Sequence, residues 1–485
     1  MTRMTIEDGA YDVIGVGFGP SNLALAIALD GMAGTQRAPA PGASAREAPT
    51  RGDRRRVHFI EKQPEFRWHS GMLLPDSRMQ VSFLKDLITL HDPTSPFTFI
   101  AYLHAKGRLV DFINQKSFFP SRIEFNDYLR WAAARFADRC SYGEEVVAVD
   151  PVAGAGGRAE PVQALAVRSV DAAGRERLRL TRDLVLAIGG RPRIPEPFRP
   201  LAGDGRVFHS STYLRHLDRL AAAERAGRGA GAGVGAGVGA GQGRVAVIGG
   251  GQSAAEIFFD IRDRFPDLRV DLILRGSALK PADDSPFVNE IFNPSFTDVI
   301  FRQPDAERQA LLQDFRSTNY SVVDLDLIRK IYEALYQQKV SGVERLRVLR
   351  GRRITGVAAD ASGVVLGSRD VLTGDSETTG YQAVILATGY DRDVPGQMVA
   401  GLAPHVVSYA PDRWYRAQTA PGFGPRIFLQ GSCEDSHGLS DTLLSVVVVR
   451  AHEIAAALLD GTLSRVFDSD AHDIVPQAVG AGRRP

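Results

Sequence analysis

The hydrophobic pattern of the chain predicts the same local fold twice: a short buried strand, a glycine turn and an apolar helix. The first copy has its strand at Asp12–Gly15 and its helix through Asn22–Leu29. The second has a strand at Val245–Ile248, a helix reaching Asp260, and a further strand at Val270–Leu274. This order suits a dinucleotide, because glycines let the backbone approach a pyrophosphate and a helix N-terminus offers N–H groups and a positive dipole.

The rest of the chain divides into irregular and regular segments. Two apolar segments broken by prolines, 72–99 and 280–296, are predicted to be irregular, and we expect the first to pack over the first cofactor. A helical region is predicted from about Asp305 to Gln338, interrupted near residues 317–320. The other predicted elements are a helix at 120–136 and strands at 145–150, 164–170, 177–180, 184–187, 384–391 and 427–429, closed by a helix within 437–458.

The first glycine turn departs from the ideal dinucleotide fingerprint. Gly15 and Gly17 fill its first two positions, but Pro20 stands at the third, with Gly19 just before it. An acid at the end of the next strand accepts hydrogen bonds from ribose hydroxyls, and Glu61 fits that role. Glu61 follows later than the usual spacing of about 20 residues. The excess falls in 33–56, which is rich in Ala, Pro, Gly and Arg and is predicted to be an inserted loop.

The second glycine turn has Gly249, Gly251 and Ala254 at the three positions. Arg275 ends the strand that follows, where an arginine suits a 2′-phosphate and an acid suits a free ribose. Taken alone, Arg275 is also compatible with an ordinary exposed strand end. Together the two turns predict FAD at the first site and NADPH at the second.

These elements predict an α/β protein with two Rossmann-like dinucleotide-binding domains and a small, mostly helical substrate-binding region. The FAD-binding domain is predicted to comprise residues 1–205 and a closing part at 381–485. The NADPH-binding domain is predicted at 206–283, with a glycine-rich linker at 221–243, and at 346–380. The helical region at 284–345 would bind the substrate.

Composition excludes several classes of protein. Among 485 residues, 58 Lys and Arg balance 57 Asp and Glu, so there is no bulk charge for binding nucleic acid or a membrane. Cys140 and Cys433 form no C-x-x-C pair, which argues against the disulfide reductases that share two dinucleotide sites. No segment is apolar enough to span a bilayer, and the polar, acidic N-terminus predicts a cytoplasmic protein. We predict no metal site.

Some single residues stand out but have two interpretations. Trp68 could shield a flavin ring or be an ordinary core residue. Lys85 lies among apolar residues, so it is either exposed or an anion clamp, since lysine is seldom buried without a partner. Asn289 and Asn319 could bind a polar ligand, although asparagine in loops usually serves turns.

The whole chain, apart from 33–56 and 221–243, resembles the flavin-dependent N-hydroxylating monooxygenases, specifically the L-ornithine N5-monooxygenases of hydroxamate siderophore biosynthesis. The resemblance is carried by MQVSFLKDLITLHDPTSPFTF, DDSPFVNEIFNP, the tripeptide Thr318–Tyr320, the ATGY at Ala387–Tyr390 and HGLSDTLLS at His437–Ser445. A further GxxxHxxxY motif, at Gly205, His209 and Tyr213, is similar to the wider flavin monooxygenase signature but lacks its leading aromatic residue.

The resemblance implies roles for particular residues. Lys85 would bind the carboxylate of L-ornithine and Asn289 its α-amino end, while Asn319 and Ser445 would lie near the reacting amine. Gln80 would lie between flavin and substrate. The implied FAD-binding residues are Gly15, Gly17, Gly19, Pro20, Glu61, Lys62, Trp68, His69, Gln80 and Leu444. The implied NADPH-binding residues are Gly249, Gly251, Gln252, Ser253, Ala254, Arg275 and Asn319.

The resemblance also implies the reaction and the assembly. NADPH would reduce FAD, O₂ would form a C4a-hydroperoxyflavin, and the ornithine side-chain amine would attack it to give N5-hydroxy-L-ornithine. No side chain is predicted as a catalytic base, and a homotetramer is implied. The alternatives are lysine N6-hydroxylation, another flavin oxidase or a Baeyer–Villiger oxygenase, and a non-catalytic NADPH-binding regulator.

Overall fold

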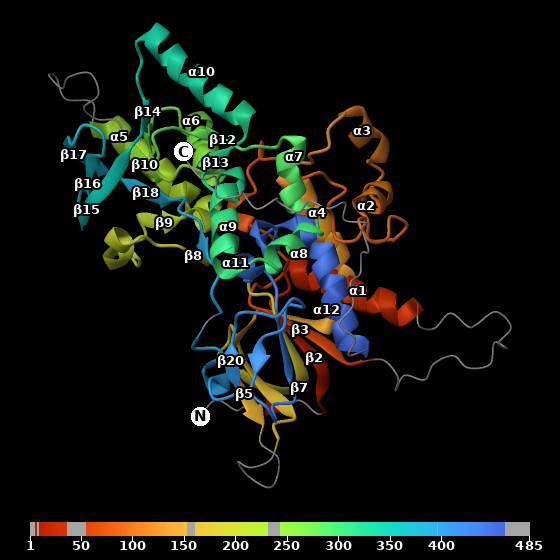
Figure 1. The fold of residues 1–485 in the computed structure, drawn as a ribbon. Coiled ribbons are helices and arrows are strands. Elements are labelled where there is room, and N and C mark those ends of the chain that lie inside the picture. Colours follow the sequence, from red (N-terminus) through yellow and green to blue (C-terminus); the bar gives the residue numbers. More distant parts are fainter. Residues whose placement is uncertain are drawn as a thin grey trace, which may run out of the picture.

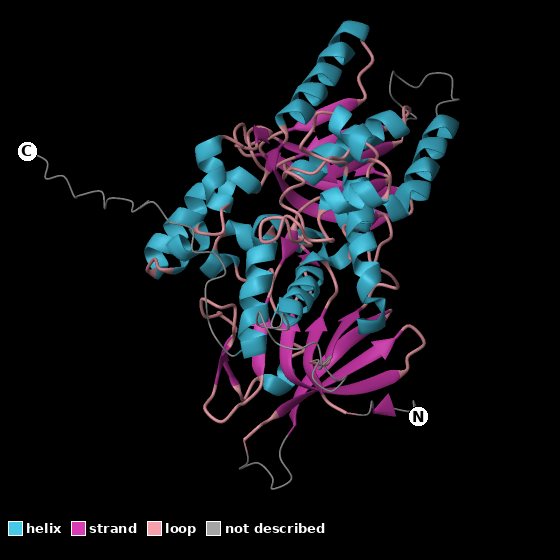
Figure 2. Ribbon diagram, turned by 90° about the vertical axis from the view of Figure 1, so that its right-hand side faces the viewer, coloured by secondary structure: helices cyan, strands magenta, loops and turns pink. Residues whose placement is uncertain are grey.

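The structure, a computed structural model, describes residues 5–6, 9–35, 55–152, 161–230, 243–394 and 396–460. Two sheets lie at opposite ends of the molecule, with helices between and around them (Figures 1 and 2). The predicted α/β fold class is confirmed. Most of the predicted loop 33–56 and the glycine-rich stretch after residue 230 lie outside the described residues.

The first sheet is built around β2, the strand before the first glycine turn. Its order is β4-β3-β2-β7-β6-β5, with β1 and β22 also paired to β7. Strands β4, β3, β2, β7 and β22 run parallel, whereas β5, β6 and β7 form an antiparallel meander. Their bounds are β1 (Thr5–Ile6), β2 (Tyr11–Val16), β3 (Val57–Glu61), β4 (Cys140–Tyr142), β5 (Glu144–Val152), β6 (Ala164–Asp171), β7 (Glu176–Leu186) and β22 (Arg426–Leu429).

Strand β7 is continuous, where the sequence predicted two strands at 177–180 and 184–187. Its first half pairs with β6 and its second half with β2 and β22, so one long strand joins the antiparallel and parallel parts of the sheet. Helix α1 (Pro20–Thr35) covers this sheet and packs against α12 (Val447–Asp460), the closing helix predicted from the C-terminal apolar run.

The second sheet is all parallel, in the order β14-β11-β10-β18-β9. Apolar residues of α5 and α6 fill one face, and an antiparallel ribbon of β15, β16 and β17 covers the other. The bounds are β9 (Val207–His209), α5 (Leu217–Ala230), β10 (Arg244–Ile248), α6 (Gln252–Arg264), β11 (Arg269–Ile273), β14 (Leu346–Leu349), β15 (Arg352–Asp360), β16 (Gly363–Asp370), β17 (Ser376–Tyr381) and β18 (Ala383–Leu386).

Three predicted boundaries differ from the structure in and around this sheet. Strand β18 pairs with β10 and β9, so residues 383–386 belong to the second sheet and not to the closing part at 381–485. Its unbroken apolar run is what a parallel strand buried on both faces requires. Residues 221–230, predicted as linker, belong to helix α5, because alanine, glutamate and arginine favour a helix there. The predicted strand 384–391 ends at Leu386, and Tyr390–Asp391 forms a separate strand, β19.

Helices α7, α8 and α9 lie between the two sheets and near the closing segment, whereas α10 lies at the outer end of the molecule, beside the second sheet (Figure 1). The predicted interruption occurs, since α9 ends at Asn319 and α10 begins at Leu325. Asp324 caps α10 by accepting a hydrogen bond from the Asp326 N–H at 2.9 Å. The elements are β12 (Lys280–Pro281), α7 (Pro286–Asn289), η6 (Glu290–Phe292), α8 (Phe296–Phe301), α9 (Asp305–Asn319), β13 (Val322–Val323) and α10 (Leu325–Ser341).

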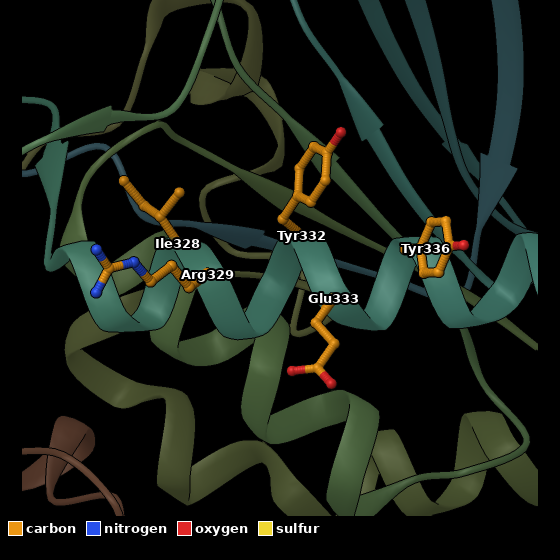
Figure 3. A pocket seen from close by; sticks show the side chains of 5 residues that line it. All are labelled: Ile328, Arg329, Tyr332, Glu333 and Tyr336. Carbon is orange, nitrogen blue, oxygen red and sulfur yellow. The ribbon is translucent and has the colours of Figure 1, made fainter.

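One long face of α10 is apolar and exposed. Tyr332 is 75% exposed, Tyr336 59% and Val340 66%. Figure 3 shows Tyr332 and Tyr336 with Ile328 around a shallow hollow on this helix. Among the described residues, no helix, α10 included, is long and apolar enough to cross a membrane.

The remaining elements are short and connect or cover the sheets. In the first half they are η2 (Ser70–Met72), α2 (Phe99–Ala105), α3 (Leu109–Asn114), α4 (Arg122–Ala133), η3 (Ala134–Arg139), β8 (Arg191–Pro192), η4 (Glu196–Leu201) and η5 (Ser210–His216). In the second half they are η7 (Ala400–Leu402), β20 (Val406–Ser408), β21 (Gln418–Thr419), α11 (Glu434–His437), η8 (Leu439–Thr442) and η9 (Leu444–Val446).

Candidate functional site

The first glycine turn forms a cradle at the N-terminus of α1. Gly17 has φ +83°, and a Cβ there would lie 2.5 Å from the Ala187 carbonyl oxygen. A Cβ on Gly19 would have no heavy atom within 4 Å, so open space faces the turn at this position. Gly15 lies within β2 against the ring of Phe59, and Pro20 begins α1. A pyrophosphate fits this arrangement of open backbone and helix N-terminus.

Glu61 lies beside the first turn, at the end of β3. Its carboxylate is buried and accepts hydrogen bonds from the backbone N–H groups of Phe18, at 2.7 Å, and Gln63, at 2.9 Å. These bonds fix the carboxylate, and each oxygen keeps a lone pair for a ribose hydroxyl. Lys62 is exposed next to it.

Rings from distant segments meet around His69. Trp68 packs edge-on to His69, with ring centroids 4.9 Å apart, and His69 adopts a left-handed backbone at φ 49°. The His69 ring lies 6.2 Å from that of Tyr390, which lies 5.1 Å from that of His209. The rings therefore connect the segment after β3, which carries Trp68 and His69, to Tyr390 in β19 and His209 in β9.

The second glycine turn also leaves a helix N-terminus without a side-chain cap. Gly249 has φ +150°, and a Cβ there would lie 2.3 Å from the Ala387 carbonyl oxygen and 3.2 Å from the Cβ of buried Ala254. Gly251 is the N-cap of α6 and offers no side chain to its first turn, so the N–H groups there are left for an anion such as a phosphate. Arg275 is exposed just beyond the end of β11.

Gln252 has structural partners that sequence reasoning missed. Its Nε2 donates to Glu256 at 2.9 Å, and its Oε1 accepts from the Asp324 N–H at 2.8 Å. Glu256 also receives both guanidinium nitrogens of Arg122, at 2.8 and 2.9 Å. This chain of bonds links α4, α6 and α10, and Ser253 stands next to it, half-buried in the first turn of α6. The sequence signal that could have revealed this network is Glu256, a glutamate among the apolar residues of α6.

The side chain of Lys85 is half-buried. Burial lowers the pKa of its ammonium group. The neighbouring carboxylate of Asp86 points inward, where it accepts from the N–H groups of Ile88, Thr89 and Phe99 at 2.9, 2.7 and 2.7 Å. Among the described residues, no carboxylate forms an ion pair with Lys85. A half-buried cation of this kind can bind an anionic ligand.

The elements that carry Asn289, Asn319 and Ser445 are packed together. Asn289 ends α7 and donates from Nδ2 to the Asp284 carbonyl oxygen at 2.6 Å. Asn319 ends α9, and Ser445 is 1% exposed in η9. A small apolar cluster joins the neighbouring parts of η6, α9 and η8 through Ile291, Leu312 and Leu439. Leu444 is half-buried next to Ser445, whereas Gln80 and Lys85 lie on the irregular segment before α2.

The chemistry of the two thiols is unlike that of a redox pair. Both cysteines are free, and burial raises the pKa of the Cys140 thiol to about 12 and that of Cys433 well above its usual value. A thiol that stays protonated at neutral pH is a poor nucleophile. Disulfide reduction therefore does not fit this structure.

The family described as L-lysine 6-monooxygenase/L-ornithine 5-monooxygenase matches residues 9–392 of the chain. The chain belongs to this family. An L-ornithine N(5)-monooxygenase of Burkholderia cepacia is 48% identical over 444 residues, which cover 90% of this chain and 91% of that relative.

Two solved structures of lysine/ornithine monooxygenases are also similar to this chain. An ornithine hydroxylase from Pseudomonas aeruginosa is 47% identical, with a TM-score of 0.82, and covers 93% of this chain and 99% of its own. The structure of an ornithine N-hydroxylase from Kutzneria sp. 744 with reduced FAD, NADP⁺ and L-ornithine is 36% identical, with a TM-score of 0.80 and the same coverage. The predicted family is therefore confirmed.

Within this family member the GxxxHxxxY motif has a structural explanation. The ring of His209 lies 3.0 Å from the carbonyl oxygen of Gly389 through Nε2, and the hydroxyl of Tyr213 donates to Asp260 at 2.6 Å. The motif thus ties β9 and η5 to the ATGY segment and to α6. Asn22, which sequence reasoning passed over, is fully buried and donates to the Gly17 carbonyl oxygen at 2.7 Å, so it holds the first glycine turn.

Proposed function

We propose that this protein is an FAD- and NADPH-dependent monooxygenase that hydroxylates the side-chain amine of L-ornithine with O₂, giving N5-hydroxy-L-ornithine for hydroxamate siderophores. The observation that carries the proposal is the presence of two open glycine turns in one chain, in a family whose relatives at 36–48% identity are ornithine hydroxylases. Lysine hydroxylation is the alternative within the family.

We assign the residues as follows. FAD would be held by Gly15, Gly17, Gly19, Pro20, Glu61, Lys62, Trp68, His69, Gln80 and Leu444. NADPH would be held by Gly249, Gly251, Gln252, Ser253, Ala254, Arg275 and Asn319. The cradle at Gly17 and Gly19 and the fixed carboxylate of Glu61 support the first set. The uncapped N-terminus of α6 supports the second.

The side chains would bind and orient the amino acid. When bound, FAD reduced by NADPH supplies the activated oxygen. Lys85 would hold the ornithine carboxylate and Asn289 the α-amino end. The distance from these two residues to Asn319 and Ser445 would then select the length of the substrate side chain. The reacting amine must be neutral, yet an alkyl ammonium has a pKa of about 10.4. Amide and hydroxyl groups near it, with little water, favour the neutral amine over the charged one.

Replacing Lys85 by alanine is expected to raise the apparent KM for ornithine by at least about tenfold, since a charge-assisted bond contributes about 1.5–3 kcal/mol. It should also uncouple NADPH oxidation from hydroxylation, because the amine is no longer held in place. The measurements are initial rates against ornithine concentration and the ratio of hydroxylamine to hydrogen peroxide. Lys330→Ala, on the exposed part of α10, is the matched control. An unchanged KM and product ratio in Lys85→Ala would refute the assignment.

The reaction itself is tested by NADPH oxidation in the FAD-loaded protein, with hydroxylamine assayed in parallel. Ornithine, lysine and no amino acid are compared. We expect hydroxylamine from ornithine alone. Hydroxylamine from lysine instead would identify the protein as a lysine N6-hydroxylase. Hydrogen peroxide without hydroxylamine from either amino acid would contradict both.

We also propose that the protein is a cytoplasmic homo-oligomer, with the tetramer of the family resemblance as the expected state. The exposed apolar face of α10 (Figure 3) supports association, because large apolar side chains rarely line up in water on a monomer. The two free cysteines fit a reducing compartment. Light scattering should give a mass above that of one chain; the mass of a single chain would contradict this.

A further inference from the structure

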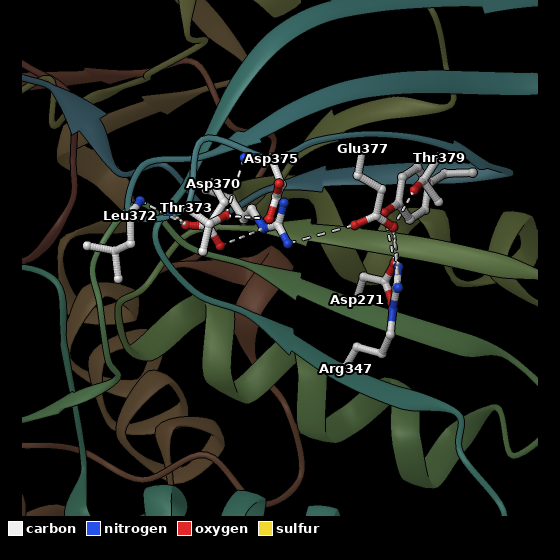
Figure 4. Close-up of polar contacts among 10 residues, drawn as sticks. Asp271, Arg347, Asp370, Leu372, Thr373, Asp375, Glu377 and Thr379 are labelled. Carbon is white, nitrogen blue, oxygen red and sulfur yellow. Dashed lines mark hydrogen bonds and ion pairs between the residues drawn. The ribbon is translucent and has the colours of Figure 1, made fainter.

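The outer edge of the second sheet holds a cavity of about 410 Å³ that none of the roles above uses. Ser277 lines it from the segment after β11, and Arg350, Gly351 and Arg352 line it from the segment after β14. The turn between β16 and β17 closes it with Asp370 and Leu372. Figure 4 shows Asp370, Leu372 and Thr373 of this turn, together with Glu377 and Thr379 of β17.

Backbone bonds place this cavity next to Arg275. Ile273 of β11 pairs with Leu349 of β14, and the ladder continues as Leu274 N–H donates to the Leu349 carbonyl oxygen at 3.0 Å. Gly351 N–H then donates to the Gly276 carbonyl oxygen at 2.9 Å. Neighbouring strands lie about 4.8 Å apart. Arg275 and Arg350 therefore leave adjacent strands at the same, carboxyl-terminal edge of the sheet, where nucleotides bind in such folds.

The arginines of this segment differ in how far their charge is already paired. Arg347 is engaged, since it donates to both oxygens of buried Asp271 at 2.8 and 2.6 Å (Figure 4). Arg350 is exposed, and no carboxylate of the described residues forms an ion pair with it. Arg352 is only 16% exposed, yet its Nε and Nη1 lack hydrogen-bond partners.

Two nearby carboxylates offset the charge of Arg352. Asp370 and Glu377 form ion pairs with its guanidinium at 3.8 and 4.0 Å. Asp370 accepts from the N–H groups of Leu372 and Thr373 at 2.8 and 3.2 Å, and Glu377 accepts from the Thr379 hydroxyl at 3.0 Å. Arg350 has no such carboxylate partner among the described residues, so the wall nearest Arg275 offers its guanidinium and the Ser277 hydroxyl, both of which suit a phosphate.

We propose that Arg350, with Ser277, forms the second wall of a 2′-phosphate site, so that the phosphate of NADPH is held between Arg275 and Arg350. A phosphate monoester carries a charge of about −1.5 to −2 at neutral pH, which two arginines from adjacent strands match better than one. This inference rests on the proposed use of NADPH and names a further residue that distinguishes NADPH from NADH.

The test is the binding of NADP⁺ and NAD⁺ to the FAD-loaded protein by calorimetry, with 2′-AMP and 5′-AMP as fragments. Arg350→Ala should weaken NADP⁺ and 2′-AMP at least about tenfold and leave NAD⁺ and 5′-AMP unchanged, because only the first pair carries the 2′-phosphate. Arg350→Lys should recover part of the loss. Arg353→Ala, an exposed neighbour that does not line the cavity, is the matched control and should bind as the unmodified protein does.

The failures are distinguishable. If the unmodified protein does not prefer NADP⁺ to NAD⁺, the proposed cofactor is wrong and this inference falls with it. If it prefers NADP⁺ and Arg275→Ala abolishes that preference while Arg350→Ala does not change it, only the inference about Arg350 is wrong. An equal loss of NADP⁺ and NAD⁺ binding in Arg350→Ala would also overturn it, since that pattern reports contact with the shared part of the nucleotide.

Discussion

Gly17→Ala is expected to abolish the retention of FAD. The backbone there has φ +83°, and an L-residue with a side chain adopts this region at a cost of about 1–2 kcal/mol. The added Cβ would lie 2.5 Å from the carbonyl oxygen of Ala187, which is backbone and cannot rotate away. The turn must therefore move, and the N–H groups at the start of α1 move with it. The measurement is the FAD content of the purified protein and the Kd for FAD added to the flavin-free protein.

Gly19→Ala separates this structural effect from contact with the cofactor. Its Cβ would meet no heavy atom within 4 Å, so the flavin-free protein should unfold at an unchanged temperature. Only FAD binding should weaken, because the methyl group would occupy the space beside the pyrophosphate. If Gly19→Ala binds FAD as tightly as the unmodified protein, the cofactor does not approach this turn. If Gly17→Ala keeps its flavin, the turn tolerates a shift that the structure does not indicate.

The parts of the fold that the sequence predicts well are those formed by consecutive residues of a short segment. The strand, glycine turn and helix at Gly15 and at Gly249 occupy consecutive residues, so their geometry can be inferred without knowing what packs around them. Glu61 was found in spite of its distance from Gly15, because a strand ending in an acid is itself a local pattern. The sequence alone left the role of Lys85 open. That role depends on the orientation of neighbours such as Asp86, whose carboxylate points inward.

The parts predicted poorly depend on which segments pair in space. An apolar strand such as β18 carries no mark of the sheet it joins, and the register with Ala246 and Val247 of β10 is visible only in the structure. The bidentate pair of Arg122 and Glu256 joins residues 134 positions apart, so that even a glutamate among apolar residues does not reveal its partner in the sequence. Gln252 was assigned to NADPH alone, because its bond to the Asp324 N–H depends on how α10 packs against α6.

Arg450→Met is expected to lower the free energy of unfolding by about 3–5 kcal/mol, because it leaves a buried carboxylate without its partner. Arg450 is 1% exposed on α12, and its Nη1 donates to Asp441 at 2.6 Å. Its Nη2 donates to the hydroxyl of Ser21, in the first turn of α1, at 2.9 Å. The Asp441 carboxylate also accepts from the Cys433 N–H at 2.7 Å, and the Asp441 carbonyl oxygen accepts from Arg450 Nη1. Arg450 thus joins the closing helix to η8 by an ion pair, and to the first turn of α1 by its hydrogen bond to Ser21.

The measurement is denaturant unfolding of the flavin-free protein, with Arg175→Met as the matched control. Arg175 pairs with Asp171 at 2.7 Å but is 69% exposed, and such surface pairs contribute about 0–1 kcal/mol. The double variant Arg450→Met with Asp441→Leu should be more stable than the sum of the two single losses predicts, because it removes the charge that each single change leaves unpaired. If Arg450→Met unfolds at the same denaturant concentration as Arg175→Met, water reaches Asp441 and the ion pair between Arg450 and Asp441 is not a buried one.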